Sequence, residues 1–295
     1  MKRAGLLFCL VWTSAALAQK SVTAENQATI TWLLHLQKAS GGFAADAGAQ
    51  TPPTLPATIS AVRAIHYFGG QAPNGDNILR FLRSCWNEKE GAFAPTPGGK
   101  TDVRTTAVAL MGLDDLSAAE QNQDMINRGM AYLGEHVKDY EDVRIAAAAF
   151  ETNHKSLAQI KKWQEILHAL PAADNAEHAR EAGGAAVALM RLGGRIDDSE
   201  ALLKRLRQGQ RREGAWGKAG APPDLESSYR IMRAFFMLKA SPANADALRK
   251  FIASCRHADG SYGIMPDQPA SVSAAYYAGI ISYWLDRLER PGKPS

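Results

Sequence analysis

The hydrophobic and polar positions of the chain form a repeating pattern. Four apolar segments end in a polar stretch, followed by a glycine or alanine beside an aromatic residue. They are "LLHLQKASGGFAADAG" at 33–48, "FLRSCWNEKEGAFAPTPG" at 81–98, "RLRQGQRREGAWGKAG" at 205–220 and "FIASCRHADGSYGIMP" at 251–266. The aromatic residues Phe43 and Phe93 lie 50 residues apart, and Trp216 and Tyr262 lie 46 apart. A period of this length is typical of stacked helical repeats.

A second apolar helix with many small residues follows each of these turns. The four second helices are "LPATISAVRAI", "DVRTTAVALMGL", "DLESSYRIMRAFFML" and "ASVSAAYYAGIISYW", with small polar residues at matching places: Thr58, Thr106, Ser228 and Ser273. Residues 139–151 and 176–194 supply two further second helices without a clear aromatic turn. Helical spacing of the apolar positions, and no alternating strand pattern, predict an all-α chain of six helix pairs.

The small residues indicate which helices lie inside. Helices rich in Ala, Ser, Thr and Gly can approach one another closely, so we expect the second helices to form an inner ring within the bulkier first helices. Asp102, Asp142 and Asp224 stand at or near the starts of second helices and are predicted to cap them. Arg104 is not explained by capping, and we expect it either to form a salt bridge or to face a central cavity.

Composition and the N-terminus narrow the class of protein. The sequence "MKRAGLLFCLVWTSAALAQK" has a basic start, an apolar stretch and a small-residue end, which predicts a signal peptide over 1–18, cleavage after Ala18 and a secreted or periplasmic protein. The remaining 19–295 form one predicted domain, with no segment apolar enough to span a membrane. Without Lys2 and Arg3 the formal charge falls from +4 to +2, which argues against a nucleic-acid binder. We expect Cys85 and Cys255 to be buried thiols.

Residues 27–287 resemble the prenyltransferase and terpenoid-cyclase superfamily. The most specific segment, "GKTDVRTTAVALMGL" at 99–113, is similar to one in the β subunits of protein farnesyltransferases, and "GGFAADAGAQTPPTLPATISAVRAI" resembles their Gly-Gly-Phe repeat. The resemblance implies a single (α/α)6 toroid with an apolar central cavity suited to an isoprenoid chain. It places Arg104 near a prenyl acceptor's carboxylate, and His178 and Tyr229 at diphosphate-binding positions.

The same resemblance does not extend to the zinc ligands and catalytic motifs of the superfamily. The zinc-binding Asp, Cys and His of the family fall at Glu226, Ser228 and Val272, and one donor of three does not make a tetrahedral zinc site. Zinc-dependent protein prenylation is therefore disfavoured, and no metal or cofactor is expected. The cyclase motif Asp-x-Asp-Asp is absent, because "GLDDLS" and "RIDDSE" lack its first aspartate and lie away from the second-helix starts. The Cys-Gly-Glu-Gln motif of thioester domains is absent too.

These observations leave two hypotheses for function. The first is a prenyltransferase-like or cyclase-like protein whose cavity holds an isoprenoid or other lipid; whether it is an enzyme stays open. The second is a non-catalytic module that binds a lipid or a peptide tail. Asp224 and Glu226 are the candidate general acids, provided that burial raises the pKa of each. The candidate ligand-binding residues are Arg104, His178, Tyr229, Arg230 and Asp102. A polysaccharide-active barrel is disfavoured by the few, scattered tryptophans, and the sequence leaves partners and oligomeric state open.

Overall fold

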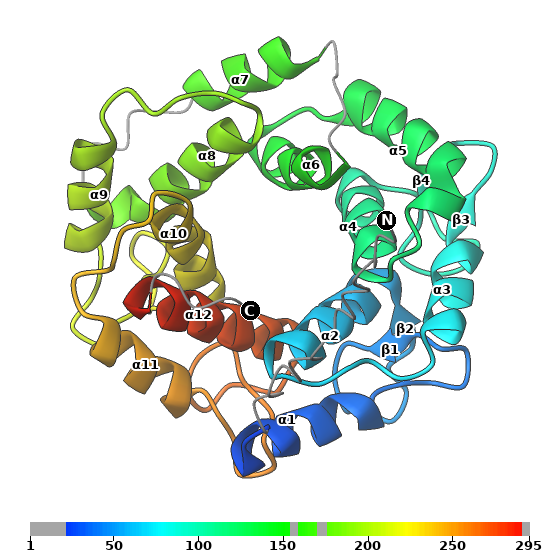
Figure 1. Cartoon of the computed structure of the whole chain (residues 1–295), viewed down its shortest axis with the longest axis horizontal. Coiled ribbons are helices and arrows are strands. Elements are labelled where there is room, and N and C mark those ends of the chain that lie inside the picture. The colour runs from blue at the N-terminus through cyan, green and yellow to red at the C-terminus, as the bar shows by residue number, and fades with distance from the viewer. Residues whose placement is uncertain (1–21, 154–158, 170–175, 291–295) are drawn as a thin grey trace, which may run out of the picture.

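The computed structural model describes residues 22–153, 159–169 and 176–290, so the predicted signal peptide lies outside the described residues. Within these ranges twelve α-helices form two concentric rings (Figure 1). The inner ring consists of α2 (Leu55–Tyr67), α4 (Val103–Asp115), α6 (Tyr140–Asn153), α8 (Ala179–Arg191), α10 (Leu225–Met237) and α12 (Val272–Glu289). The outer ring consists of α1 (Ala24–His35), α3 (Gly75–Ser84), α5 (Gln123–His136), α7 (Ile160–His168), α9 (Ser199–Gln208) and α11 (Ala245–Ser254). The predicted all-α toroid of six helix pairs is confirmed.

The ring closes on itself. Each inner helix packs against the next, and α12 packs against α2 to complete the circle. The backbone N–H of Val272 donates to the carbonyl of Ala45 at 2.9 Å, which ties the last inner helix to the first turn. The hydroxyl of Thr29 donates to the carbonyl of Gly260 at 2.8 Å, which ties the first outer helix to the last turn. The first and last repeats are therefore hydrogen-bonded to each other, and the ring has no open end.

A glycine two residues before each turn aromatic lets the chain reverse. Gly41, Gly91, Gly214 and Gly260 all have positive φ values, between 63° and 92°. This backbone region strains residues that carry a Cβ atom. A Cβ atom on Gly41 would also lie 2.3 Å from the carbonyl oxygen of Asn77. The Gly–aromatic pattern therefore encodes a turn that other residues would distort.

The small polar residues of the inner helices anchor these turns. The hydroxyl of Thr58 accepts a hydrogen bond from the Phe43 N–H at 2.9 Å, and Thr106 accepts one from the Phe93 N–H at 3.0 Å. Ser228 does the same for Trp216 at 3.2 Å. Each of these hydroxyls lies four residues after its helix cap. Ser273 differs, because it lies only two residues after the cap of α12 and lines the central cavity.

The turns also contain two very short antiparallel pairs of strands that the sequence does not predict. The strand β1 (Phe43–Ala44) pairs with β2 (Pro53–Thr54), and β3 (Trp86–Asn87) pairs with β4 (Ala92–Phe93). The turn aromatics are buried, with Phe43 and Phe93 fully enclosed. Each pair closes a turn between an outer and an inner helix, so the fold remains all-α in character.

Capping follows the prediction at two of three aspartates. Asp102 and Asp224 precede α4 and α10, and each accepts the N–H of the residue three positions on at 2.7 Å. Asp142 is not the cap of α6: it lies in the first turn, and Asp139 accepts its N–H at 3.0 Å. The third helix pair is joined by a short connection, so its cap lies closer to the preceding helix than the sequence comparison suggests.

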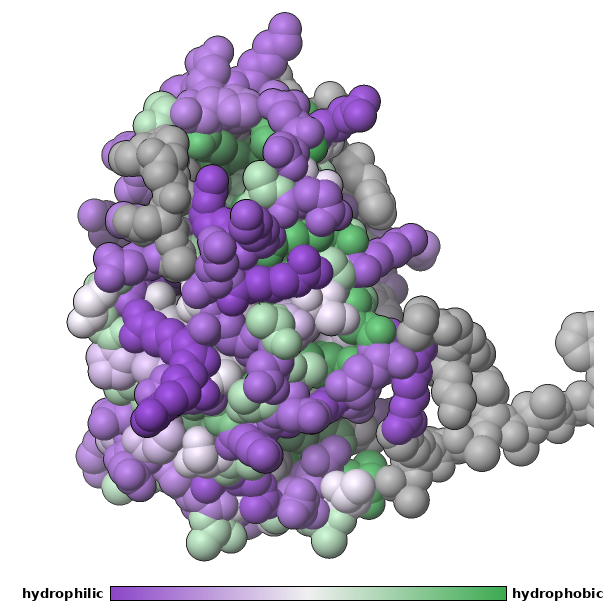
Figure 2. Space-filling view, turned by 90° about the vertical axis from the view of Figure 1, so that its left-hand side faces the viewer, coloured by the Kyte–Doolittle hydropathy of each residue, from purple (hydrophilic) through white to green (hydrophobic). Residues whose placement is uncertain are grey.

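The two remaining cysteines are buried, unpaired thiols, as predicted. Burial raises the pKa of Cys85 to about 11 and that of Cys255 to about 12. Neither thiol is therefore a nucleophile at neutral pH. The outer face toward α9 is predominantly hydrophilic (Figure 2), as expected for a solvated surface. Among the described helices none is long and apolar enough to cross a membrane.

Candidate functional site

A central cavity of about 360 Å³ lies inside the inner ring. Successive inner helices are joined through an outer helix that runs in the opposite direction, so all six inner helices point the same way. Their N-termini surround one end of the cavity, here called the mouth, where Arg104 and Ser273 lie exposed. The middle of the cavity is lined by apolar and aromatic side chains, among them Ile59, Val108 and Tyr229.

The cavity is more polar than the sequence predicts. Its lining includes five arginines and four tyrosines: Arg63, Arg104, Arg144, Arg191, Arg233, Tyr67, Tyr229, Tyr276 and Tyr277. Only two carboxylates, Asp115 and Glu151, lie among them. The prediction of an apolar cavity is therefore wrong, because the inner helices direct isolated charged residues toward the axis. The lining carries a surplus of positive charge instead.

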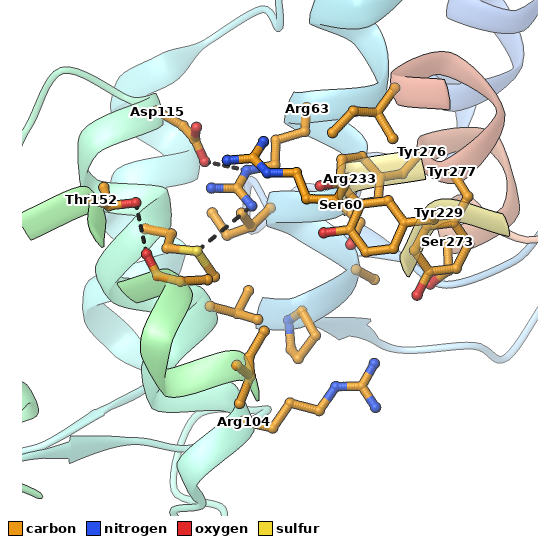
Figure 3. Close-up of a pocket in the computed structure, with 18 of the residues that line it drawn as sticks. Ser60, Arg63, Arg104, Asp115, Thr152, Tyr229, Arg233, Ser273, Tyr276 and Tyr277 are labelled. Atoms are coloured by element: carbon orange, nitrogen blue, oxygen red, sulfur yellow. Dashed lines mark hydrogen bonds and ion pairs between the residues drawn. The ribbon is translucent and has the colours of Figure 1, made fainter. Parts of the chain in front are cut away.

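Five of these charged residues form a belt around the end of the cavity opposite the mouth. This charged belt consists of Arg63, Asp115, Glu151, Arg191 and Arg233, one from each of α2, α4, α6, α8 and α10. The Nε of Arg63 lies 2.6 Å from a carboxylate oxygen of Asp115 (Figure 3). Glu151 is shared: its Oε2 lies 3.0 Å from Nε of Arg191 and 3.3 Å from Nη2 of Arg233. Two carboxylates thus face three guanidinium groups.

A group of aromatic rings lies beside the belt. Tyr229 packs against Tyr276, Tyr277 and Trp284, with ring centroids 5.0–5.7 Å apart. Burial alone would raise the pKa of Tyr229, but the nearby Arg191 and a hydrogen bond with Tyr276 outweigh burial and lower it. Burial raises the pKa of Tyr276 well above its usual range. Two adjacent tyrosine hydroxyls in the lining give this part of the cavity polar groups that a ligand can contact.

Near the mouth, a second set of charges joins α6, α8 and α10. This mouth network consists of Glu141, Arg144, Arg180, Glu181, Glu226 and Arg230. Arg230 bonds Glu141 at 2.6 Å and Glu226 at 2.5 Å, and its side chain is only 5% exposed. Arg180 bonds Glu181 at 3.0 Å and lies 3.5 Å from Glu226. Only Arg144 of this network lines the cavity, so the network mainly connects helices.

The structure places two of the five candidate ligand-binding residues in the cavity. Arg104 and Tyr229 line it, and Arg104 makes no hydrogen bond or ion pair with any other described residue. Arg230 is buried in the mouth network, and Asp102 caps α4. His178 is exposed at the start of α8 and does not line the cavity.

The two candidate general acids lie outside the cavity lining as well. Asp224 uses both carboxylate oxygens on Ser227, one on its N–H at 2.7 Å and one on its hydroxyl at 2.8 Å. Burial opposes ionisation of Glu226, yet Arg230 and Arg180 lower its pKa. A general acid requires a raised pKa, so Glu226 does not meet the condition under which it was a candidate.

Asp115 is a site residue that sequence reasoning set aside. It belongs to "GLDDLS", which departs from the cyclase motif, but as the last residue of α4 it reaches the cavity. Burial raises the pKa of Asp115, although Arg63 opposes the rise. Arg63, Arg191 and Arg233 were missed too. The sequence feature that could have revealed them is an arginine within an inner helix that otherwise carries many small or apolar residues. Arg63 and Arg233 each lie nine residues after the cap of their helix.

No group of three or more His, Cys, Asp or Glu side chains within the described ranges could hold a metal ion. The positions that match the family's zinc ligands have other roles. Ser228 bonds the turn at Trp216, and Val272 is buried at the start of α12. Glu226 bonds Arg230. These residues do not fit a zinc site, because two of the three supply no metal ligand.

Comparison with known families identifies the fold's relatives. The model of the prenyltransferase alpha-alpha toroid domain matches residues 1–152 and 151–290. The chain belongs to this family. No curated protein sequence matches the chain. The family assignment agrees with the closed double ring of helices, and it confirms the resemblance to prenyltransferases and terpenoid cyclases.

Solved structures of the same architecture include enzymes with different chemistry. The type II terpene cyclase MstE from Scytonema is 11% identical, with a TM-score of 0.60, and the match covers 90% of this chain and 97% of that chain. A variant of it, in complex with its substrate geranylgeranyl dihydroxybenzoate, has a TM-score of 0.58. A family 76 glycoside hydrolase from a bovine Bacteroides thetaiotaomicron strain is 11% identical, with a TM-score of 0.57 and coverage of 89% and 77%. At this identity the likeness concerns the fold alone.

Proposed function

We propose that this is an exported toroid protein whose central cavity binds an isoprenoid or other lipid-like molecule with an acidic group. The observation that carries the proposal is the cavity lining, in which five arginines face two carboxylates around an apolar and aromatic middle. A purely apolar ligand would leave the surplus guanidinium groups without acceptors. An acidic ligand with an apolar chain satisfies both parts of the lining.

The size of the cavity supports a small-molecule ligand. A volume of about 360 Å³ falls in the range of pockets that enclose most of a small ligand. Ile59, Val108 and Ile145 line the same cavity as the tyrosine rings and provide apolar contacts there. Such contacts suit an apolar chain, and the arginines orient the ligand by its charged group.

A fold neighbour gives independent support for this ligand class. The substrate bound to the MstE variant, geranylgeranyl dihydroxybenzoate, combines an isoprenoid chain with an aromatic acid. The likeness in sequence is too low to transfer that substrate to this chain. It supports only the idea that a protein of this fold binds a molecule that carries both a prenyl chain and an acidic group.

A second candidate function is acid-catalysed conversion of the same ligand. The observation that favours it is Asp115, which lines the cavity and has a raised pKa. A carboxylic acid within a prenyl-binding cavity can protonate an alkene if it carries a proton when the ligand binds. The ion pair with Arg63 opposes this role. Binding without conversion is therefore the first proposal.

The test compares ligands that differ only in their charged group. The mature protein is titrated with farnesoic acid, farnesyl phosphate and farnesol, and binding is measured by calorimetry and native mass spectrometry. We expect at least one acidic ligand to bind more than about tenfold more tightly than farnesol, since a charge-assisted hydrogen bond contributes roughly 1.5–3 kcal/mol. Equal affinity for all three would overturn the proposal.

Catalysis is tested in the same samples. Bound and released ligand are analysed by chromatography and mass spectrometry after prolonged incubation. A cyclised product that disappears in Asp115→Asn would favour the enzyme, and unchanged ligand in both proteins would favour a binding module. Arg249→Gln on outer helix α11 serves as the control and should behave like the wild type. Its side chain pairs with Asp286 and Glu289, and none of these residues lines the cavity.

A further inference from the structure

The charged belt has more donors than its carboxylates can accept. Nε of Arg191 bonds Glu151, but the two terminal amino groups of Arg191 make no hydrogen bond with any described residue. The side chain of Arg191 is nevertheless 90% buried, with 10% of its surface exposed. Arg191 lines the cavity, so an acceptor from a bound ligand can complete its hydrogen bonding.

Arg233 is also incompletely satisfied. One terminal nitrogen lies 3.3 Å from the Glu151 oxygen that Arg191 already uses. Its Nε is buried and has no hydrogen-bond partner among the described residues. A buried donor without an acceptor lowers stability, so such groups in native proteins usually have a partner. Two neighbouring arginines with one carboxylate oxygen between them therefore form an incomplete anion site.

The arginines nearer the mouth do not offer an equivalent site. Arg180 and Arg230 also have an unpaired Nε, but carboxylates bond both of their terminal nitrogens, and neither residue lines the cavity. Arg144 lines the cavity and bonds Glu141 only through Nε, but no second cavity-lining arginine shares that carboxylate oxygen, so it does not form a paired site. Arg104 is unpaired but exposed, so water already satisfies its donors. A charged group gains most where its partner is shielded from solvent, which favours the belt over the mouth.

We propose that the acidic group of the ligand is a single carboxylate, bound by Arg191 and Arg233 at the belt, with its apolar chain directed toward the mouth. This inference rests on the proposed function and adds the chemical class and the place of the acidic group. Three guanidinium groups and two carboxylates leave the belt with one positive charge, which one carboxylate neutralises. A phosphate or diphosphate would add surplus negative charge beside Glu151.

The hydroxyl of Tyr229 completes the site. Tyr229 lies in the middle of the cavity, five residues into α10, and Arg233 follows one turn later on the same helix. Residues four apart on a helix lie on the same face. A carboxylate on Arg191 and Arg233 thus lies beside a hydroxyl that can donate a further hydrogen bond. The apolar chain then extends past Ile59 and Val108.

The test uses two matched variants of cavity-lining arginines, Arg191→Gln at the belt and Arg104→Gln at the mouth. Affinities for farnesoic acid, farnesyl diphosphate and farnesol are measured by calorimetry on the mature protein. We expect Arg191→Gln to lower the affinity for farnesoic acid about tenfold or more and to leave the affinity for farnesol unchanged. Arg104→Gln should change the affinity for farnesoic acid less than about twofold. The wild-type protein should prefer farnesoic acid to farnesyl diphosphate.

The opposite results would overturn the inference. Loss of farnesoic acid binding in Arg104→Gln but not in Arg191→Gln would place the acidic group at the mouth. A tenfold preference for farnesyl diphosphate would exclude a single carboxylate while leaving the proposed function intact, whereas equal binding of farnesol would contradict the proposed function itself. If circular dichroism shows that Arg191→Gln is unfolded, Arg233→Gln replaces it with the same expected result.

Discussion

The two groups of arginines differ in their stoichiometry more than in their burial. In the mouth network, Arg144, Arg180 and Arg230 face three glutamates; both terminal nitrogens of Arg180 and Arg230 are bonded, whereas Arg144 bonds Glu141 through Nε alone. In the charged belt, three arginines face two carboxylates, and Glu151 serves two of them with one oxygen. The matched group joins helices, and the unmatched group is available to a ligand. Counting acceptors separates the two more clearly than locating charges does.

The largest expected effect breaks the matched group. Arg230→Met removes a cation that is 95% buried and leaves Glu141 and Glu226 without their main partner. We expect the free energy of unfolding to fall by about 2–3 kcal/mol, below the usual cost of breaking a buried pair because both glutamates are partly exposed. Urea unfolding measures it. Arg249→Met should cost less than about 1 kcal/mol, and equal losses in both would contradict a structural role for the network.

The next largest effect is expected on ligand affinity, from a change in the charged belt. Glu151→Gln removes one of the two carboxylates of the belt and leaves Arg191 and Arg233 both uncompensated. We expect affinity for farnesoic acid to rise about threefold to tenfold, because the site gains positive charge. Glu226→Gln removes a glutamate of the mouth network and should leave this affinity unchanged. Calorimetry compares the two, and a loss of affinity in Glu151→Gln would mean that Glu151 itself contacts the ligand.

Asp102 tests whether a residue beside the mouth acts on the ligand or on the helix. Asp102→Ala removes the side chain that accepts the Thr105 N–H at the start of α4. We expect a loss of about 1 kcal/mol in stability, the usual cost of an N-cap, and no change in affinity for farnesoic acid. Thermal unfolding and calorimetry on the same sample provide both values. A weaker ligand at unchanged stability would assign Asp102 to the binding site instead.

The smallest expected effect is on the stability of the protein at low pH. Burial opposes ionisation of Glu141, but Arg230 and Arg144 lower its pKa to about 2. The folded-state pKa lies below the unfolded value near 4.5, so this stabilisation is complete above pH 4.5 and is lost as pH falls toward 2. Because Glu141 is half exposed, we expect roughly 1 kcal/mol or less. Urea unfolding between pH 5 and 3 should show a shallower decline in Arg230→Met than in the wild type.

Much of the fold can be predicted from the sequence because local chemistry sets it. Gly41 and Phe43 define a turn, Thr58 anchors it and Asp102 caps a helix. The bond from the Phe43 N–H to Thr58 spans 15 residues and the cap spans three, so all of these interactions lie within one repeat. The third repeat shows the limit, since its cap is Asp139 and not Asp142. No aromatic turn marks where α6 begins, so its start cannot be located to the residue.

The charged belt could not be predicted in the same way. Arg63 and Asp115 are 52 residues apart, and Arg191 and Glu151 are 40 apart. Only the common height of the inner helices brings them together, and small shifts in helix start decide which residue faces the axis. Tyr229 was found because the family resemblance supplied its position, whereas Arg104 already stood out because helix capping does not explain it. The prediction of an apolar cavity was wrong because it weighed the many small residues and overlooked the arginine that follows them.

The seam between Val272 and Ala45 has a consequence for how the molecule comes apart. A linear stack of repeats has terminal units that can detach one at a time, whereas here both ends of the chain support each other. Thr29 and Gly260 are separated by 231 residues, so the circle cannot be completed until nearly the whole chain has emerged. Loss of either end repeat therefore opens the hollow centre to solvent along its full height.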